Sequence, residues 1–280
     1  MFYQTYKTTL KNISRSKTFW LAVMMLFIIV IHHSNARYNA QRNYSYGGAR
    51  LALDFRDTMQ SVANDSYYPL LFAMPLVSVI ATVMVLNRDY GDSFFEIEKS
   101  RGVKTYKYLT GRLAGLITVN FSVYALAVFT KFYWYIFLYR GANGMGTAEM
   151  LVDTIVRLVR DIVLAGFPCI LFYICFTYAM GSIFKNAVMG AAAGIGYIVA
   201  FYAAYMNLRL RVNPFYFDYL SPVPDKLRDY WHFYDTEWFE WTIDYLGTSL
   251  AKAMACIGVF VGVSLIYCVI AYVRTHKREI

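Results

Sequence analysis

Long apolar runs separated by polar segments dominate the pattern along this chain. Six runs approach or reach spanning length, because a hydrocarbon core of ~30 Å takes about 20 helical residues. The runs cover residues 18–32, 68–86, 113–138, 161–181, 187–207 and 249–273. The first is short, so we expect its helix to continue beyond the apolar core. The pattern predicts an all-α membrane protein with six transmembrane helices in a single transmembrane domain over residues 1–280.

The first 17 residues are patterned but not apolar enough to span a membrane. Apolar side chains recur there at helical spacing and basic side chains face away; the apolar set is Phe2, Tyr6, Leu10 and Ile13, and the basic set is Lys7, Lys11 and Arg15. Such a stripe is typical of an amphipathic helix that lies along the headgroups with its basic face toward anionic lipid. The alternative is a signal-peptide n-region with a weak cleavage site at 34–36. We expect the interfacial helix.

Basic residues are distributed unevenly among the connections. Lys and Arg number 14 in residues 1–17, 87–112, 182–186 and 274–280, but only 11 in the much longer segments 33–67, 139–160 and 208–248. The positive-inside rule therefore predicts that both termini and the 87–112 loop lie in the cytoplasm, and we expect a bacterial plasma membrane.

Composition agrees with lipid as the surrounding solvent. Apolar residues make up 58% of the chain and charged residues 16%, against about a quarter in soluble domains. The net charge of +9 comes from residues that flank apolar runs rather than from one block, which indicates membrane topology and not nucleic-acid binding. Segment 208–248 is rich in Trp and Tyr, so we expect it to pack as short helices at the outer membrane surface.

Catalytic signatures are absent from the sequence. It contains no H-E-x-x-H, no G-x-S-x-G and no phosphate-binding loop, so we predict no catalytic, metal or cofactor residue in this chain. Lys131 lies within a span near the outer surface, where we expect it to snorkel. The pair His32-His33 is interpreted as a polar cap rather than a metal site. All four cysteines fall in apolar runs and are interpreted as small buried hydrophobes: Cys169, Cys175, Cys256 and Cys268.

Two pairs of glycines occur at four-residue spacing inside apolar runs. Gly190 and Gly194 form one pair, and Gly258 and Gly262 form the other. Small residues at this spacing let helix backbones approach closely in lipid. Either pair could serve packing within the chain or an interface between subunits, and the sequence leaves both open.

The inner segment 87–112 contains a short candidate helix over 93–100. Ser93 is a plausible N-cap with Glu96 three positions later, and Gly102 marks the helix stop. Phe94 and Phe95 are costly to expose to the cytoplasm, so this helix is a candidate for docking a soluble partner. The alternative is that it lies on the membrane surface.

These features resemble the six-span permease subunits of type-2 ABC transporters, most of which are exporters. Residues 94–112 are similar to the family's coupling helix, an acidic stretch followed by a Ser-x-Gly/Pro-Val-x-x-x-x-Tyr-x-x-Gly-Lys/Arg run. Residues 10–20 look like its connecting helix, and 208–248 looks like its outer segment before the last span. Gly102 departs from the proline that is frequent there. The positions matching the coupling-helix motif are Glu96, Glu98, Ser100, Gly102, Val103, Tyr108, Gly111 and Arg112.

The resemblance implies that two permease chains pair, identical or different, and that separate ATPase subunits carrying ATP and Mg²⁺ drive export of an amphipathic or hydrophobic substrate such as a peptide, a drug or a lipid-linked molecule. The residues expected to couple to the ATPase subunit are Phe94, Phe95, Glu96, Glu98 and Arg101. The residues expected to line the substrate path, on the second and fifth spans, are Met74, Ser78, Thr82, Tyr197, Phe201 and Tyr205. An intramembrane enzyme and a non-transporting membrane sensor or scaffold are the alternatives.

Overall fold

The computed structural model describes most of the helical part of the chain. Its described residues are 2–43, 45–46, 49–50, 73–92, 94–138, 166–207 and 258–276, with the single positions 155, 159 and 163. The segment 208–248, for which we predict short surface helices, lies outside the described residues, as do most of 33–67 and 139–160.

Helices make up nearly all of the described structure, as predicted. They are α1 (Phe2–Ser14), α2 (Lys17–Asn43), α5 (Ala73–Tyr90), α6 (Phe94–Ser100), α7 (Thr105–Leu138), α9 (Phe167–Phe184), α10 (Ala187–Asn207) and a C-terminal helix, Gly258–His276. The exception to an all-α fold is a pair of two-residue antiparallel strands, β1 (Ser45–Tyr46) and β2 (Ala49–Arg50).

Four described helices are long and apolar enough to cross a membrane. They are Lys17–Ala36, Thr105–Leu138, Phe167–Phe184 and Gly258–His276, which correspond to the first, third, fourth and sixth predicted spans. The expected extension of the first span is confirmed, because α2 continues to Asn43. The second and fifth predicted spans correspond to α5 and α10. Both are helical, but their described parts are not both long and apolar enough to be counted among the membrane-crossing helices. The chain is therefore a helical membrane protein, and the count of six spans stays a prediction.

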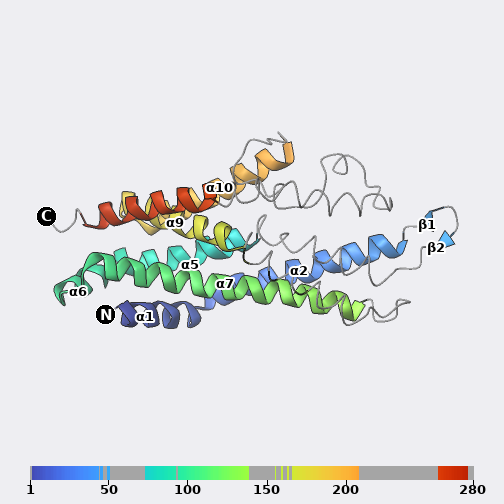
Figure 1. The fold of residues 1–280 in the computed structure, drawn as a ribbon, viewed down its shortest axis with the longest axis horizontal. Helices are drawn as coiled ribbons and strands as arrows, with labels where there is room; N and C mark the ends of the chain where they lie inside the picture. The colour runs from blue at the N-terminus through green and yellow to red at the C-terminus, as the bar shows by residue number, and fades with distance from the viewer. Residues whose placement is uncertain are drawn as a thin grey trace.

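The helices run along one long axis, and the two ends of the molecule differ. Figure 1 shows α1, α6 and the end of the C-terminal helix at one end, with β1 and β2 at the other. In the middle, α5 packs against α2, α7, α9 and α10. Its position explains why almost its whole length is buried, including Met74, Val77 and Leu86.

Helix α1 packs against the first turns of α7 through small side chains. A Cβ atom built on Gly111 would lie 2.9 Å from Thr5, and one on Gly115 would lie 2.9 Å from Thr9, so the two backbones approach as closely as glycine permits. This Gly111/Gly115 face was not identified from the sequence. The predicted N-terminal helix is present, but only part of its apolar stripe is buried.

The apolar side chains of α1 differ in exposure between the start and the end of the helix. Phe2 is exposed, whereas Ile13 is completely buried in the core. Whether α1 lies at a membrane interface stays a prediction.

The two predicted glycine faces behave differently. Gly190 and Gly194 pack within the chain: an added Cβ at Gly194 would meet Thr177 of α9 and Val79 of α5 at 2.8 Å. Gly258 and Gly262 have no atom within 4 Å of such a Cβ among their described surroundings. The first pair therefore serves intrachain packing, and the question of a subunit interface remains for the second.

The predicted inner loop 87–112 is largely helical. Helix α5 continues to Tyr90 and α7 begins at Thr105, so Asp89 and Arg112 lie on long helices rather than in a loop. The predicted short helix is confirmed as α6, and Gly102 ends it with a left-handed φ of 77°, which glycine adopts without strain. Ser93, the predicted N-cap, lies outside the described residues.

Candidate functional site

A buried ion pair joins α5 to α7 near the end of the molecule that carries α6. Arg112 Nη2 lies 2.7 Å from Asp89 Oδ1, and the two side chains are 0% and 1% exposed. Burying two charges costs several kcal/mol each in lost hydration, and the pair persists only if its geometry and its remaining hydrogen bonds compensate. The hydrogen-bond partners around both side chains therefore decide whether the buried pair is stable.

Tyrosine hydroxyls complete the coordination of the carboxylate. Tyr108, one turn before Arg112 on α7, donates to Asp89 Oδ1, and Tyr178 of α9 donates to Asp89 Oδ2 at 2.8 Å. Both carboxylate oxygens are thus satisfied without water. Asp89 lies beyond the apolar run of its helix, and burial raises its pKa while the Arg112 charge and the two hydroxyls act in the opposite direction. The carboxylate depends on these donors to stay ionised.

The guanidinium reaches a fourth helix. Arg112 Nη1 donates to Thr9 Oγ1 of α1 at 3.1 Å, and its Nε donates to the Tyr108 hydroxyl at 3.2 Å. We call the set Thr9, Asp89, Tyr108, Arg112 and Tyr178 the polar node. Because its members come from α1, α5, α7 and α9, the polar node fixes these four helices relative to one another where they converge.

Helix α6 is attached to the polar node by its two phenylalanines. The Phe95 ring packs edge-on against Tyr108 with centroids 5.2 Å apart, and Phe95 is buried. The Phe94 ring lies 5.0 Å from the guanidinium carbons of both Arg88 and Arg112, a cation–π arrangement. A displacement of α6 would therefore act directly on the buried pair.

The opposite face of α6 is exposed. Glu96 and Ile97 point away from the bundle, and Ile97 is 45% exposed. Glu98 accepts a hydrogen bond from Arg101 at 3.3 Å, an exposed ion pair of the kind that contributes little to stability. Of the five predicted coupling residues, the structure thus places Phe95 inside the protein, leaves Phe94 half-buried beside the two arginines, and keeps Glu96 and Arg101 at the surface.

The predicted path residues of α5 share one face. Met74, Ser78 and Thr82 follow each other at four-residue spacing and are all completely buried, with the Thr82 hydroxyl donating to the Ser78 carbonyl at 2.7 Å. Tyr197 of α10 is half-buried in an aromatic cluster. The side chains of Phe201 and Tyr205 lie outside the described residues. The rings that surround Tyr197 are Phe172, Tyr173 and Phe176.

The prediction that Lys131 snorkels to the membrane surface is wrong. It is 1% exposed, with its Nζ 6.0 Å from the centre of the Tyr135 ring one turn on. Its position on α7 turns it toward the bundle rather than toward the surface, which the hydropathy of the run does not reveal. Cys175 and Cys268, interpreted from the sequence only as small buried hydrophobes, have their sulfur atoms 3.1 Å apart between α9 and the C-terminal helix.

Sequence reasoning found part of the polar node and missed the rest. Tyr108 and Arg112 were noticed only as positions of a family motif, and Asp89 and Tyr178 were not singled out. One signal was available: Tyr108 and Arg112 are four residues apart, so they share a helix face, and the acidic Asp89 lies near the end of the apolar helix α5. No group of three or more metal-ligating side chains occurs among the described residues.

Comparison with known proteins adds no identification. No model of a protein family matches the sequence, and no significant match to a curated protein is found.

Proposed function

We propose that this chain is the permease subunit of an ATP-driven ABC transporter and that α6 receives the force of a separate ATPase subunit carrying ATP and Mg²⁺. The observation that carries the proposal is the two-sided construction of α6. One face presents Glu96 and Ile97 to the surroundings, and the other is anchored to the polar node by Phe94 and Phe95.

This construction suits the transmission of a mechanical displacement. Packed protein interiors have low compressibility, so a push on α6 reaches the rings and then the ion pair without being absorbed. The polar node ties α6 to α1, α5, α7 and α9, three of which reach into the apolar bundle. Movement of α6 would thus tilt several helices together, as alternating access requires.

The transported substrate in this proposal is amphipathic or hydrophobic, exported between two permease chains. A path lined by Met74, Ser78 and Thr82 of α5 and by Tyr197 of α10 would open only when the helices separate, because the α5 side chains are closed off from the surface in this conformation. The cytoplasmic side of the membrane is assigned to the end of the molecule that carries α1 and α6, on the basis of the basic residues there.

The proposal is tested by purifying the tagged full-length chain from membranes of its own host and assaying the preparation for a bound subunit that hydrolyses ATP. We expect such a subunit, and we expect Ile97→Glu to release it. Tyr3→Glu is the matched control, because Tyr3 is another exposed apolar residue at the same end of the bundle, 67% exposed on α1.

The outcomes separate the alternatives. If no ATP-hydrolysing protein accompanies the chain, the transporter assignment is rejected and an intramembrane enzyme gains weight. If the subunit binds but reconstituted vesicles move no substrate under ATP, the sensor or scaffold alternative replaces transport. Equal release by Ile97→Glu and Tyr3→Glu would reject α6 as the docking element.

A further inference from the structure

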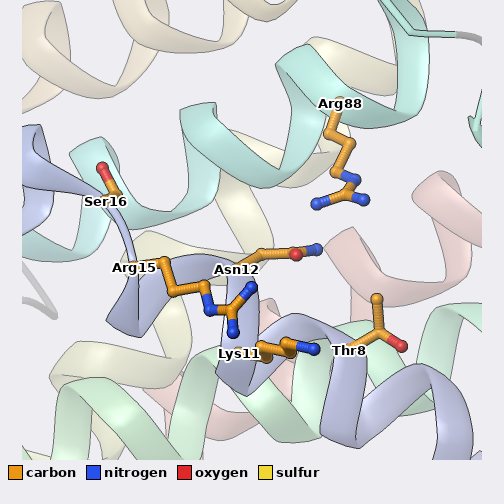
Figure 2. A pocket seen from close by; sticks show the side chains of 6 residues that line it. All are labelled: Thr8, Lys11, Asn12, Arg15, Ser16 and Arg88. Atoms are coloured by element: carbon orange, nitrogen blue, oxygen red, sulfur yellow. The ribbon is translucent and has the colours of Figure 1, made fainter.

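A basic pocket separates α1 from the end of α5. Figure 2 shows Arg88 reaching from α5 toward the side chains of α1, with Asn12 directed into the space between them. The cavity has a volume of about 430 Å³, within the range of small-molecule sites. Its lining residues are Thr8, Lys11, Asn12, Arg15, Ser16 and Arg88.

No residue in the described part of the chain balances the charges in this pocket. Lys11, Arg15 and Arg88 supply three cations, none of the lining residues is acidic, and none of the three forms an ion pair with another described residue. Clustering like charges without an acidic partner is unfavourable unless an anion enters. The pocket is thus suited to a negatively charged ligand.

A buried donor points to the same kind of occupant. The amide nitrogen of Asn12 is buried and has no hydrogen-bond partner among the described residues. Leaving a buried donor unsatisfied costs about 1–3 kcal/mol, and such groups are rare in folded proteins. An oxygen-rich anion held by the three cations would also accept a hydrogen bond from this amide.

The pocket lies where the apolar helix α2 begins and the apolar helix α5 ends. Ser16 lies in the junction between α1 and α2, immediately before the apolar run 18–32, and its hydroxyl contacts Met84 Sδ of α5 at 3.4 Å. Trp20 is 51% exposed beside it and donates to the Ser14 carbonyl at 2.7 Å. Exposed tryptophans are typical of the headgroup region of a membrane.

We propose that this pocket binds the phosphate of an anionic phospholipid headgroup, with Lys11, Arg15 and Arg88 around the phosphate oxygens and the Asn12 amide donating to one of them. The depth of the site favours a lipid over a soluble phosphate compound. Because Arg88 also lies over Phe94, the bound phosphate would sit next to the attachment of α6. The inference needs the membrane but not the ATPase subunit, so it stands or fails separately from the proposed function.

The test measures how much phosphatidylglycerol, relative to phosphatidylcholine, the purified full-length chain retains from mixed vesicles, by native mass spectrometry. Removing both exposed cations in Lys11→Gln/Arg15→Gln should weaken retention of phosphatidylglycerol, about fivefold for each charge removed. The control Lys7→Gln/Lys104→Gln removes two exposed cations at the same end that do not line the pocket, and we expect it to retain the lipid.

A charge-neutral variant distinguishes a built site from diffuse attraction. Asn12→Leu removes the buried donor and places an apolar side chain in the pocket, so retention should fall although the net charge is unchanged. Thermal stability measured without lipid checks that each variant is folded. Equal retention by the pocket variants and the control would overturn the proposal, as would stabilisation of the chain by inorganic phosphate with no preference for phosphatidylglycerol, which would identify a soluble ligand.

Discussion

The most direct test of the polar node is Arg112→Met, which removes the guanidinium but keeps a long side chain. The change leaves Asp89 buried with only two hydroxyl donors, and it removes the link to Thr9 of α1. Breaking a buried ion pair by removing one partner costs about 3–5 kcal/mol, because the remaining charge stays desolvated. For a chain of this length each kcal/mol lowers the melting temperature by about 2 °C, so we expect a fall of ~6–10 °C.

The assay is the thermal stability of the detergent-purified protein, followed by size-exclusion chromatography after heating. Arg101→Met is the matched control, since the Arg101 side chain is 68% exposed and its pair with Glu98 should contribute less than about 1 kcal/mol. A melting temperature for Arg112→Met within the scatter of this control would refute the reasoning.

A double substitution separates charge from packing. Asp89→Asn carries no charge; its one carbonyl oxygen can accept from the hydroxyl of Tyr108 or Tyr178, and its amide nitrogen can donate to the other hydroxyl. Combined with Arg112→Met, it removes the uncompensated charge, so the double variant should be more stable than Arg112→Met alone. If the stability losses of Asp89→Asn and Arg112→Met simply add in the double variant, the uncompensated charge is not the cause of the loss in Arg112→Met.

Three further predictions concern packing around the polar node and within the bundle. Phe95→Ala should lower the free energy of unfolding by about 3–4 kcal/mol, because it empties a buried position against Tyr108; a loss below about 1 kcal/mol in the same thermal assay would place Phe95 at the surface. Gly194→Leu should destabilise the protein by about 1–3 kcal/mol, whereas Gly196→Leu, two residues away with no atom within 4 Å of an added Cβ, should not; equal melting temperatures would refute the packing of α10. Mild oxidation should join Cys175 to Cys268, whose sulfur atoms are 3.1 Å apart, giving a cross-linked peptide pair in a digest; recovery of both thiols unmodified would argue against the position of the C-terminal helix.

Much of the helical framework could be predicted from hydropathy, because a residue's preference for lipid is a local property. The apolar runs located four helices that can cross a membrane, and the run at 18–32 was correctly expected to continue as helix. The short helix α6 and its stop at Gly102 were also predictable. Residues that begin a helix and a glycine that ends it act on the backbone within a single turn, so their effect can be read from the local sequence.

Predictions that depended on the direction of a side chain were less successful. Lys131 was expected to snorkel to the surface and is buried. The packing of the buried Phe95 ring on Tyr108 was not predicted, and its role in coupling stays a prediction. How each helix is turned relative to its neighbours decides whether such a side chain is covered, and this orientation has no signature in the local pattern.

The sequence by itself determined that this protein is helical, that it is a membrane protein, and that a short polar helix interrupts its apolar runs, because these properties follow from local composition and periodicity. Only the tertiary structure decided that Asp89 and Arg112 form a completely buried pair, satisfied by Thr9, Tyr108 and Tyr178. The physical reason is that a charge is stable away from water only when its partners are in place, and these partners come from four helices that meet only in the folded chain.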